Sequence, residues 1–326
     1  MDSNNSSQGF PPPSVCSSDL YWRLAQLVVT LTLILVIVTN LLMLLVTWHA
    51  ISTRINPYFF VSLAMSDLLT GVFVLPFHLA FAARSERGIP GHAICTFSGV
   101  TFHILQTVSL FSFFALSLDR LVSINFPLKY PNLLTRQVNV AILLVIWLMP
   151  TLMYGLIPAT GLGQYVYKCW QSMCNLGPID TNYLTVLMLL CVAVFLATYA
   201  INGRIFYIAR QQQAKISNLE QQFHASTGHS LKFKARMRAA RSIMMALGLF
   251  TLCWGPYYAT LFCLVLFNAA VTPVTEFVLL WIAISNSYMN FFVFLATYRS
   301  FRTHFMRLVG LGNRVRGADV TTVSSS

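Results

Sequence analysis

Charged side chains are scarce in this sequence. Asp, Glu, Lys and Arg make up 9% of its 326 residues, whereas a soluble globular domain carries about 25%. Hydrophobic residues instead make up 56% of the chain. Because so few polar side chains are available to face water, the composition predicts a membrane protein.

Patterns that would indicate an enzyme or a metalloprotein are missing as well. The sequence has no Gly-rich phosphate-binding loop and no His-Glu-x-x-His pattern. Its first 20 residues are polar and lack the apolar core of a secretory signal peptide. The seven cysteines show no metal-like spacing; they are Cys16, Cys95, Cys169, Cys174, Cys191, Cys253 and Cys263. We therefore expect no enzymatic activity and no cofactor.

Seven long apolar stretches are present instead. A helix needs about 20 mostly apolar residues to cross a bilayer, and backbone groups in lipid must be hydrogen-bonded within their own segment. Each stretch is therefore predicted to be a helix. The sequence predicts an all-α membrane protein, a seven-transmembrane helix bundle with spans at residues 24–48, 57–81, 95–124, 138–156, 183–207, 239–267 and 273–297.

The net charge of +12 is explained by topology rather than by nucleic acid. With the N-terminus outside, all but four of the 21 Lys and Arg lie on the inner side, as in most multi-pass proteins. The sequence thus predicts a plasma-membrane protein with an extracellular N-terminus. The basic residues around the fifth and sixth helices are also expected to meet anionic membrane lipid or a partner protein on the inner side.

Four regions follow from this topology. Residues 1–23 form an extracellular tail, and the sequons at Asn4 and Asn5 in it are candidate glycosylation sites. Residues 24–297 form the seven-transmembrane domain. Residues 298–310 are predicted to form a short amphipathic helix on the inner leaflet, because Phe301, Phe305 and Leu308 share one face. Residues 311–326 form a cytoplasmic tail.

Two acidic residues lie deep within the predicted spans, where a charge costs about 2.5–3.5 kcal/mol or more. Asp67 needs a cation, a proton or polar neighbours there. Asp119 is followed directly by Arg120, which is consistent with a local ion pair.

Six motifs, in all the predicted helices except the fifth, resemble those of rhodopsin-like G-protein-coupled receptors, and they occur in the same order over residues 24–308. The resemblance implies a small-molecule ligand, a heterotrimeric G protein and arrestin as partners. The alternative left open is a seven-helix binding protein that does not signal. The motifs are Asn40, Leu63-Ala64-Met65-Ser66-Asp67, Asp119-Arg120, Trp147, Cys253-Trp254-Gly255-Pro256 and Asn286-Ser287-Tyr288-Met289-Asn290.

Some positions depart from that family's pattern. Leu121 follows Asp119-Arg120 where members have Tyr, and Phe291 and Phe294 replace the Pro and Tyr that follow Asn290. Phe102 stands where amine receptors carry an Asp, which disfavours monoamine ligands. The last span has no Lys for a retinal Schiff base.

The sixth helix resembles that of the G-protein-coupled bile acid receptor, through Trp254-Gly255-Pro256-Tyr257, whereas Gln211-Gln212-Gln213 at the end of the fifth is similar to adenosine receptors. The resemblance implies an acidic amphipathic ligand of the bile-acid or steroid type and a rise in cAMP. An adenosine-like or other lipid ligand is the alternative. The ligand-binding residues that the resemblance implies in this chain are Phe102, His103, Gln106, Tyr257, Leu261, Trp281 and Ile284.

Other roles are implied by the family as a whole. Trp254, Asp119, Arg120 and Asn290 are expected to act as the activation switch, with Trp254 at the floor of the ligand site. An allosteric sodium ion is expected at Asp67, Ser109, Asn286, Ser287 and Asn290, although a dry hydrogen-bonded cluster there is the alternative. A disulfide is expected to join Cys95 to Cys174 rather than to Cys169. Core packing equally explains Phe102 and Trp281, and His103 can instead be a helix-facing histidine bonded to a neighbour.

Overall fold

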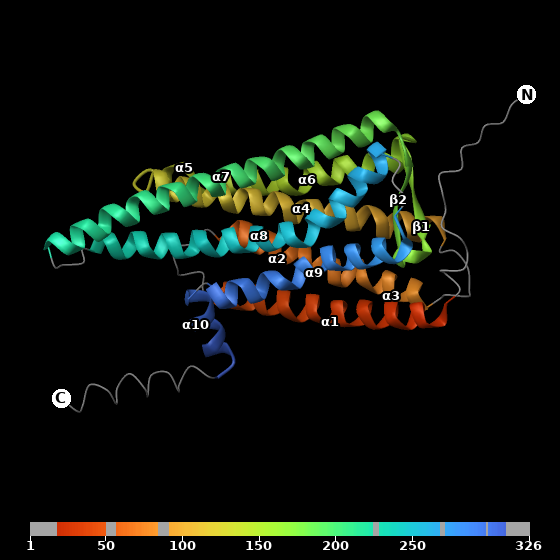
Figure 1. Ribbon diagram of the computed structural model, residues 1–326, viewed down its shortest axis with the longest axis horizontal. Coiled ribbons are helices and arrows are strands. Elements are labelled where there is room, and N and C mark those ends of the chain that lie inside the picture. The colour runs from red at the N-terminus through yellow and green to blue at the C-terminus, as the bar shows by residue number, and fades with distance from the viewer. Residues whose placement is uncertain are drawn as a thin grey trace, which may run out of the picture.

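The computed structural model describes residues 18–49, 57–83, 91–223, 228–267, 271–297 and 299–310. The predicted sequons at Asn4 and Asn5 lie outside these residues. The chain forms a bundle of long helices that run side by side (Figure 1). The longer ones are α1 (Asp19–His49), α2 (Pro57–Phe73), α4 (His92–Asn125), α6 (Arg136–Thr160), α7 (Thr181–Phe223), α8 (Gly228–Phe267) and α9 (Pro273–Thr297).

The described residues contain seven segments long and apolar enough to cross a membrane, which confirms the predicted bundle. They are Asp19–Trp48, Pro57–Ala83, His92–Asn125, Arg136–Thr160, Thr181–Ile208, Arg241–Leu264 and Pro273–Thr297. Large apolar side chains such as Leu31, Leu148 and Leu196 are more than half exposed on the outside of the bundle. In a membrane this surface faces lipid, so its exposure costs nothing there.

Helix α1 begins at Asp19, five residues before the predicted start of the span. Ser18 caps it: its Oγ accepts a hydrogen bond from the Tyr21 backbone N–H at 3.4 Å. Trp22 is buried, and the Tyr21 ring packs edge-on against Phe277 at 5.4 Å between ring centres. Residues that the sequence assigned to the tail therefore belong to the bundle.

The second span is interrupted at Val74 and continues as α3 (Leu75–Ala83). Pro76 explains the break, because proline has no backbone N–H and its ring disfavours the preceding helical turn. The N–H groups of Phe77 and His78 both bond the Val74 carbonyl, at 3.1 and 3.2 Å. The helix resumes with His78 completely buried.

A β-hairpin that the sequence did not predict covers one end of the bundle (Figure 1). Strand β1 (Gly163–Lys168) pairs antiparallel with β2 (Met173–Ile179), and the short 3₁₀ helix η1 (Cys169–Gln171) connects them. Gly99 lets this hairpin approach α4, since a Cβ there would lie 2.5 Å from Tyr165 Cδ1. We call this end of the molecule the hairpin end.

Two short helices lie at the opposite end (Figure 1): α5 (Tyr130–Leu133) and α10 (Arg299–Leu308). The apolar face of α10 packs on the bundle, where the ring centre of Phe301 lies 5.8 Å from that of Phe291 and 6.2 Å from that of Phe60. Arg302 and Arg307 are exposed on its other side. This distribution is that of a helix lying at a membrane surface.

Candidate ligand-binding site

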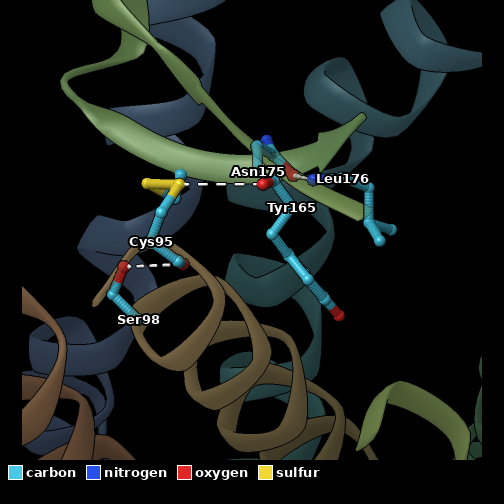
Figure 2. Close-up of a disulfide and its surroundings, with 6 residues drawn as sticks. Cys95, Ser98, Tyr165, Asn175 and Leu176 are labelled. Atoms are coloured by element: carbon cyan, nitrogen blue, oxygen red, sulfur yellow. Dashed lines mark hydrogen bonds between the residues drawn. A yellow bond between two sulfur atoms is a disulfide. The ribbon is translucent and has the colours of Figure 1, made fainter. Parts of the chain in front are cut away.

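A disulfide between Cys95 and Cys174 fastens the hairpin to the first turn of α4 (Figure 2), as predicted. Their Cα atoms are 5.3 Å apart. Cys169 has a disulfide of its own, so it does not compete for Cys95. The bond holds β2, and with it Asn175, over the end of the helix bundle.

Most of the predicted ligand-binding residues belong to the apolar core of the bundle, and Tyr257 among them contacts the hairpin. Phe102 from α4, Tyr257 from α8, and Trp281 and Ile284 from α9 are all buried within one continuous apolar core, and Leu261 packs against it half-buried. Gln106 lies one turn below Phe102 and is also buried. The group is aromatic and apolar with a few polar atoms, which is the usual character of a small-molecule site.

His103 touches this group through Phe102, whose ring lies edge-on at 5.3 Å between ring centres, and otherwise faces α6 and the hairpin. Its ring packs against Tyr154 of α6 and Tyr165 of β1, at 5.3 and 5.7 Å between ring centres. Its Nδ1 lies 2.8 Å from the carbonyl oxygen of Gly99, one helical turn back. A carbonyl can only accept, so Nδ1 carries the proton and donates it within α4. The ring nitrogen that carries the proton is therefore already used within α4.

Asn175 connects the hairpin to the predicted site, and its only signal in the sequence was its place directly after Cys174. Its Nδ2 lies 3.2 Å from the hydroxyl oxygen of Tyr257 and 3.0 Å from Oε1 of Gln171. Because the Tyr257 oxygen accepts here, its own hydrogen stays free to donate to a ligand.

Glu276, in the first turn of α9, holds the connection between the two strands in place. Its Oε2 accepts hydrogen bonds from Trp170 Nε1 at 2.7 Å and from Gln171 Nε2 at 2.9 Å. The carbonyl of Trp170 accepts in turn from the Tyr21 hydroxyl. Burial lowers the pKa of Lys168 in β1, and the negative charge of Glu276 partly offsets this. The sequence analysis overlooked Glu276, although an acid at the start of the last span was its signal.

His78 is a second residue that the sequence analysis missed. It comes from α3, and its ring lies between two predicted ligand-binding residues: the ring centres of Phe102 and Trp281 are 6.1 and 6.0 Å away. It is completely buried. Its signal in the sequence was a lone histidine in an apolar stretch, which does not reveal its neighbours.

The predicted sodium-site residues gather around Asp67 in the middle of the bundle. Asn290 Nδ2 donates to Asp67 Oδ2 at 3.1 Å, and Asn40 Nδ2 donates to the Ser287 carbonyl at 2.9 Å. Three of the predicted residues carry a buried oxygen with no hydrogen-bond partner within the described part of the chain: Ser109 Oγ, Asn286 Oδ1 and Asn290 Oδ1. Oxygen atoms beside a carboxylate are the ligands that a hard cation prefers, so these residues fit a sodium ion.

The predicted switch residues form two separate groups. Trp254 is buried in α8 and stacks on Phe250 and Tyr258, with ring centres 6.2 and 5.4 Å away. Pro256, two residues later, cannot donate the helical hydrogen bond that the Leu252 carbonyl would accept, which weakens the helix at this point. Asp119 and Arg120 form an ion pair at the opposite end from the hairpin, as predicted.

Comparison with known proteins decides the family. The family model described as "7 transmembrane receptor (rhodopsin family)" matches residues 39–294. The chain belongs to the rhodopsin family of seven-transmembrane receptors. As a member of this family it is a receptor and not an enzyme. It is a multi-pass protein of the plasma membrane that couples a small-molecule ligand to a G protein.

Several members of this family are similar to the chain along most of its length. The histamine H2 receptor of Rattus norvegicus is 30% identical over 311 residues, which cover 90% of this chain and 82% of that receptor. The histamine H2 receptor of Canis lupus familiaris is 31% identical over 284 residues, or 82% of this chain and 74% of the receptor. The histamine H2 receptor of Homo sapiens is 31% identical over 265 residues, which cover 77% and 69%.

Proposed function

We propose that this receptor binds a small amphipathic ligand of the bile-acid or steroid type beneath the hairpin and raises cAMP through its G protein. The hairpin end then faces the outside of the cell, together with the N-terminus. Helix α10 and the ends of α7 and α8 meet the G protein and lipid on the inside. Arrestin is the second expected partner on that side.

The observation that supports this ligand class is the character of the buried group under the hairpin. Phe102, Trp281 and Ile284 are apolar and at most 5% exposed. The seven residues predicted to bind the ligand include no Asp or Glu. Such a surface favours the rigid hydrocarbon body of a steroid, which gains free energy by leaving water.

Polar groups on the hairpin side of this surface suit an amphipathic molecule. The Tyr257 hydroxyl has a hydrogen to donate to a ligand oxygen. Lys168 is half-buried in the hairpin, and its pKa is lowered by burial. A ligand carboxylate beside it stabilises the charged lysine.

Histamine is the second candidate, because the relatives described above bear its name. Phe102 provides no carboxylate for an ammonium group, so an amine has to use Glu276. That side chain is half-buried, and its Oε2 already accepts two hydrogen bonds from the hairpin. A cation there competes with Trp170 and Gln171, which makes histamine the weaker candidate.

A cAMP assay with a matched ligand panel tests the proposal. Cells expressing the full chain are treated with bile acids, neutral steroids, adenosine and histamine, and nucleotide exchange on purified G protein is measured alongside. Bile acids or steroids are expected to raise cAMP, and Tyr257→Phe to weaken the response about tenfold, as for the loss of one buried hydrogen bond. A response to histamine or adenosine alone contradicts the ligand class. Ligand binding without nucleotide exchange indicates the non-signalling alternative.

A further inference from the structure

Two buried side chains under the hairpin, one from α3 and one from α9, have nitrogens that the protein leaves without a hydrogen-bond partner. His78 is 0% exposed, and within the described residues neither of its ring nitrogens is bonded. Trp281 is 5% exposed, and its Nε1 is likewise unbonded in that part of the chain. Their rings meet edge to face with centres 6.0 Å apart.

Such a pair is unusual in a folded protein. Buried polar side chains are nearly always hydrogen-bonded, since leaving one unpaired forfeits the hydrogen bonds it made with water. Both residues are held by packing, because His78 and Trp281 contact Phe102 and Phe277 respectively. The protein therefore holds two unpaired polar side chains side by side in an otherwise apolar region.

The chemistry of the two side chains selects what can complete them. An indole nitrogen can only donate a hydrogen bond, and a neutral imidazole has one donor and one acceptor. A ligand oxygen that accepts at about 2.9 Å from the indole N–H and from an imidazole N–H satisfies a donor on each side chain. An ammonium group has donors only and leaves the Trp281 N–H unpaired.

We propose that His78 and Trp281 form a subsite for a hydroxyl or ketone oxygen at one end of the ligand. The inference rests on the proposed function and makes it more specific, since it assigns a polar group of the ligand to a pair of residues. The ring of Phe102, on the other side of His78, contacts the adjoining hydrocarbon. Trp281 thus serves as a hydrogen-bond donor as well as an apolar wall.

The ligand-free receptor provides the first test, with His103 as the matched control. Full-length receptor in lipid nanodiscs is heated, and the melting temperatures of H78F and H103F are compared with that of the unmodified chain. His78→Phe removes unpaired nitrogens and is expected to leave the melting temperature unchanged or raise it by about 2–4 °C. His103→Phe breaks the bond to Gly99 and is expected to lower it. A fall in H78F as large as in H103F shows that His78 has a protein or water partner, which overturns the inference.

A pair of probes that differ by one oxygen provides the second test. Lithocholic acid carries a ring hydroxyl that 5β-cholanic acid lacks. Half-saturation of the unmodified receptor is expected to need at least tenfold less lithocholic acid than 5β-cholanic acid. In H78F and in W281F this gap is expected to shrink to about twofold or less. A gap that persists in both variants contradicts the subsite.

Failure of the proposed function gives a different result. If neither steroid changes the melting temperature of the unmodified receptor but histamine does, the proposed ligand class is wrong. The subsite is then judged with histamine, whose imidazole carries an acceptor nitrogen: loss of its effect in H78F supports the subsite, and an unchanged effect refutes it. If none of the three probes acts, the ligand-free comparison of H78F with H103F decides the inference alone.

Discussion

The hydroxyl of Tyr130 donates a hydrogen bond to Oδ1 of Asp119 at 2.7 Å, and this bond joins α5 to the end of α4. The other carboxylate oxygen of Asp119 pairs with Arg120. Burial, reinforced by the negative charge of Asp119, raises the pKa of Tyr130 above its ordinary value of 10.0. The contribution of the neutral hydroxyl to stability is therefore present below pH 10 and is lost as the pH rises above it. One tyrosine thus helps to fix the ion pair that the G-protein end presents.

Tyr130→Phe is expected to increase signalling without ligand. The variant removes a hydrogen bond to a charged acceptor, which contributes about 1.5 kcal/mol or more when buried. If the bond exists only in the resting state, its loss raises the active population up to about tenfold. The measurement is basal nucleotide exchange on purified G protein at matched receptor concentration. Tyr199→Phe is the control, because Tyr199 is exposed inside the α7 span and away from its G-protein end. Equal basal rates in Y130F and the unmodified receptor contradict the prediction.

Removal of the Cys95–Cys174 disulfide is expected to destabilise the receptor. A disulfide typically contributes about 2–4 kcal/mol, and this one closes a loop across 79 residues. Replacing both cysteines with serine is expected to lower the melting temperature and the amount of receptor at the cell surface. Cys263→Ser is the control, since Cys263 is free and exposed. If the variant with both cysteines replaced has the same melting temperature as C263S, the disulfide does not stabilise the fold.

Glu276→Ala is expected to loosen the hairpin. The carboxylate accepts from Trp170 and Gln171, and its loss removes about 1.5 kcal/mol or more of hydrogen bonding. Amide hydrogen exchange in residues 163–179 is expected to become roughly tenfold faster. Glu276→Gln keeps an acceptor oxygen without the charge and should give an intermediate rate. Because the charge of Glu276 raises the pKa of Lys168, that pKa is expected to fall further in both variants.

A double-mutant cycle locates the effect. Trp170→Phe removes one of the same hydrogen bonds from the hairpin side. The double variant of Glu276→Ala and Trp170→Phe should therefore lose less free energy of hairpin opening, measured by amide exchange, than the two single variants lose together. If the two losses simply add, Glu276 and Trp170 act independently. That result contradicts a stabilising role for the 2.7 Å hydrogen bond between them.

Sodium is expected to stabilise the receptor through Asp67. The melting temperature should be higher in sodium chloride than in N-methyl-D-glucamine chloride at the same ionic strength, since the organic cation is too large for the buried cluster. Asp67→Asn is expected to abolish this difference and Ser109→Ala to reduce it. Ser98→Ala is the control on the same helix, because Ser98 Oγ bonds the Cys95 carbonyl. If both salts give one melting temperature, the cluster is held by hydrogen bonds alone. A cation that prefers the resting form should also weaken agonist binding.

The sequence by itself determined the parts of this protein that depend on local composition and on spacing along the chain. The lengths of the apolar runs set the seven spans, because a bilayer requires about 20 such residues regardless of what surrounds them. The adjacent charges of Asp119 and Arg120 indicated their ion pair. The order of the motifs indicated the family and, through it, the disulfide from Cys95 to Cys174.

Only the tertiary structure decided which side chains meet. A helix presents each residue at an angle fixed by its packing against several neighbours, so adjacent positions can face different partners. Phe102 and His103 are consecutive, yet Phe102 faces His78 of α3, whereas His103 faces Tyr154 of α6. The hairpin likewise escaped prediction, because its strands gain stability from α4 and from the disulfide rather than from their own sequence. The contact between His78 and Trp281 depends on the break in the helix at Val74 and on which face α9 turns toward α3. Neither can be read from the order of residues.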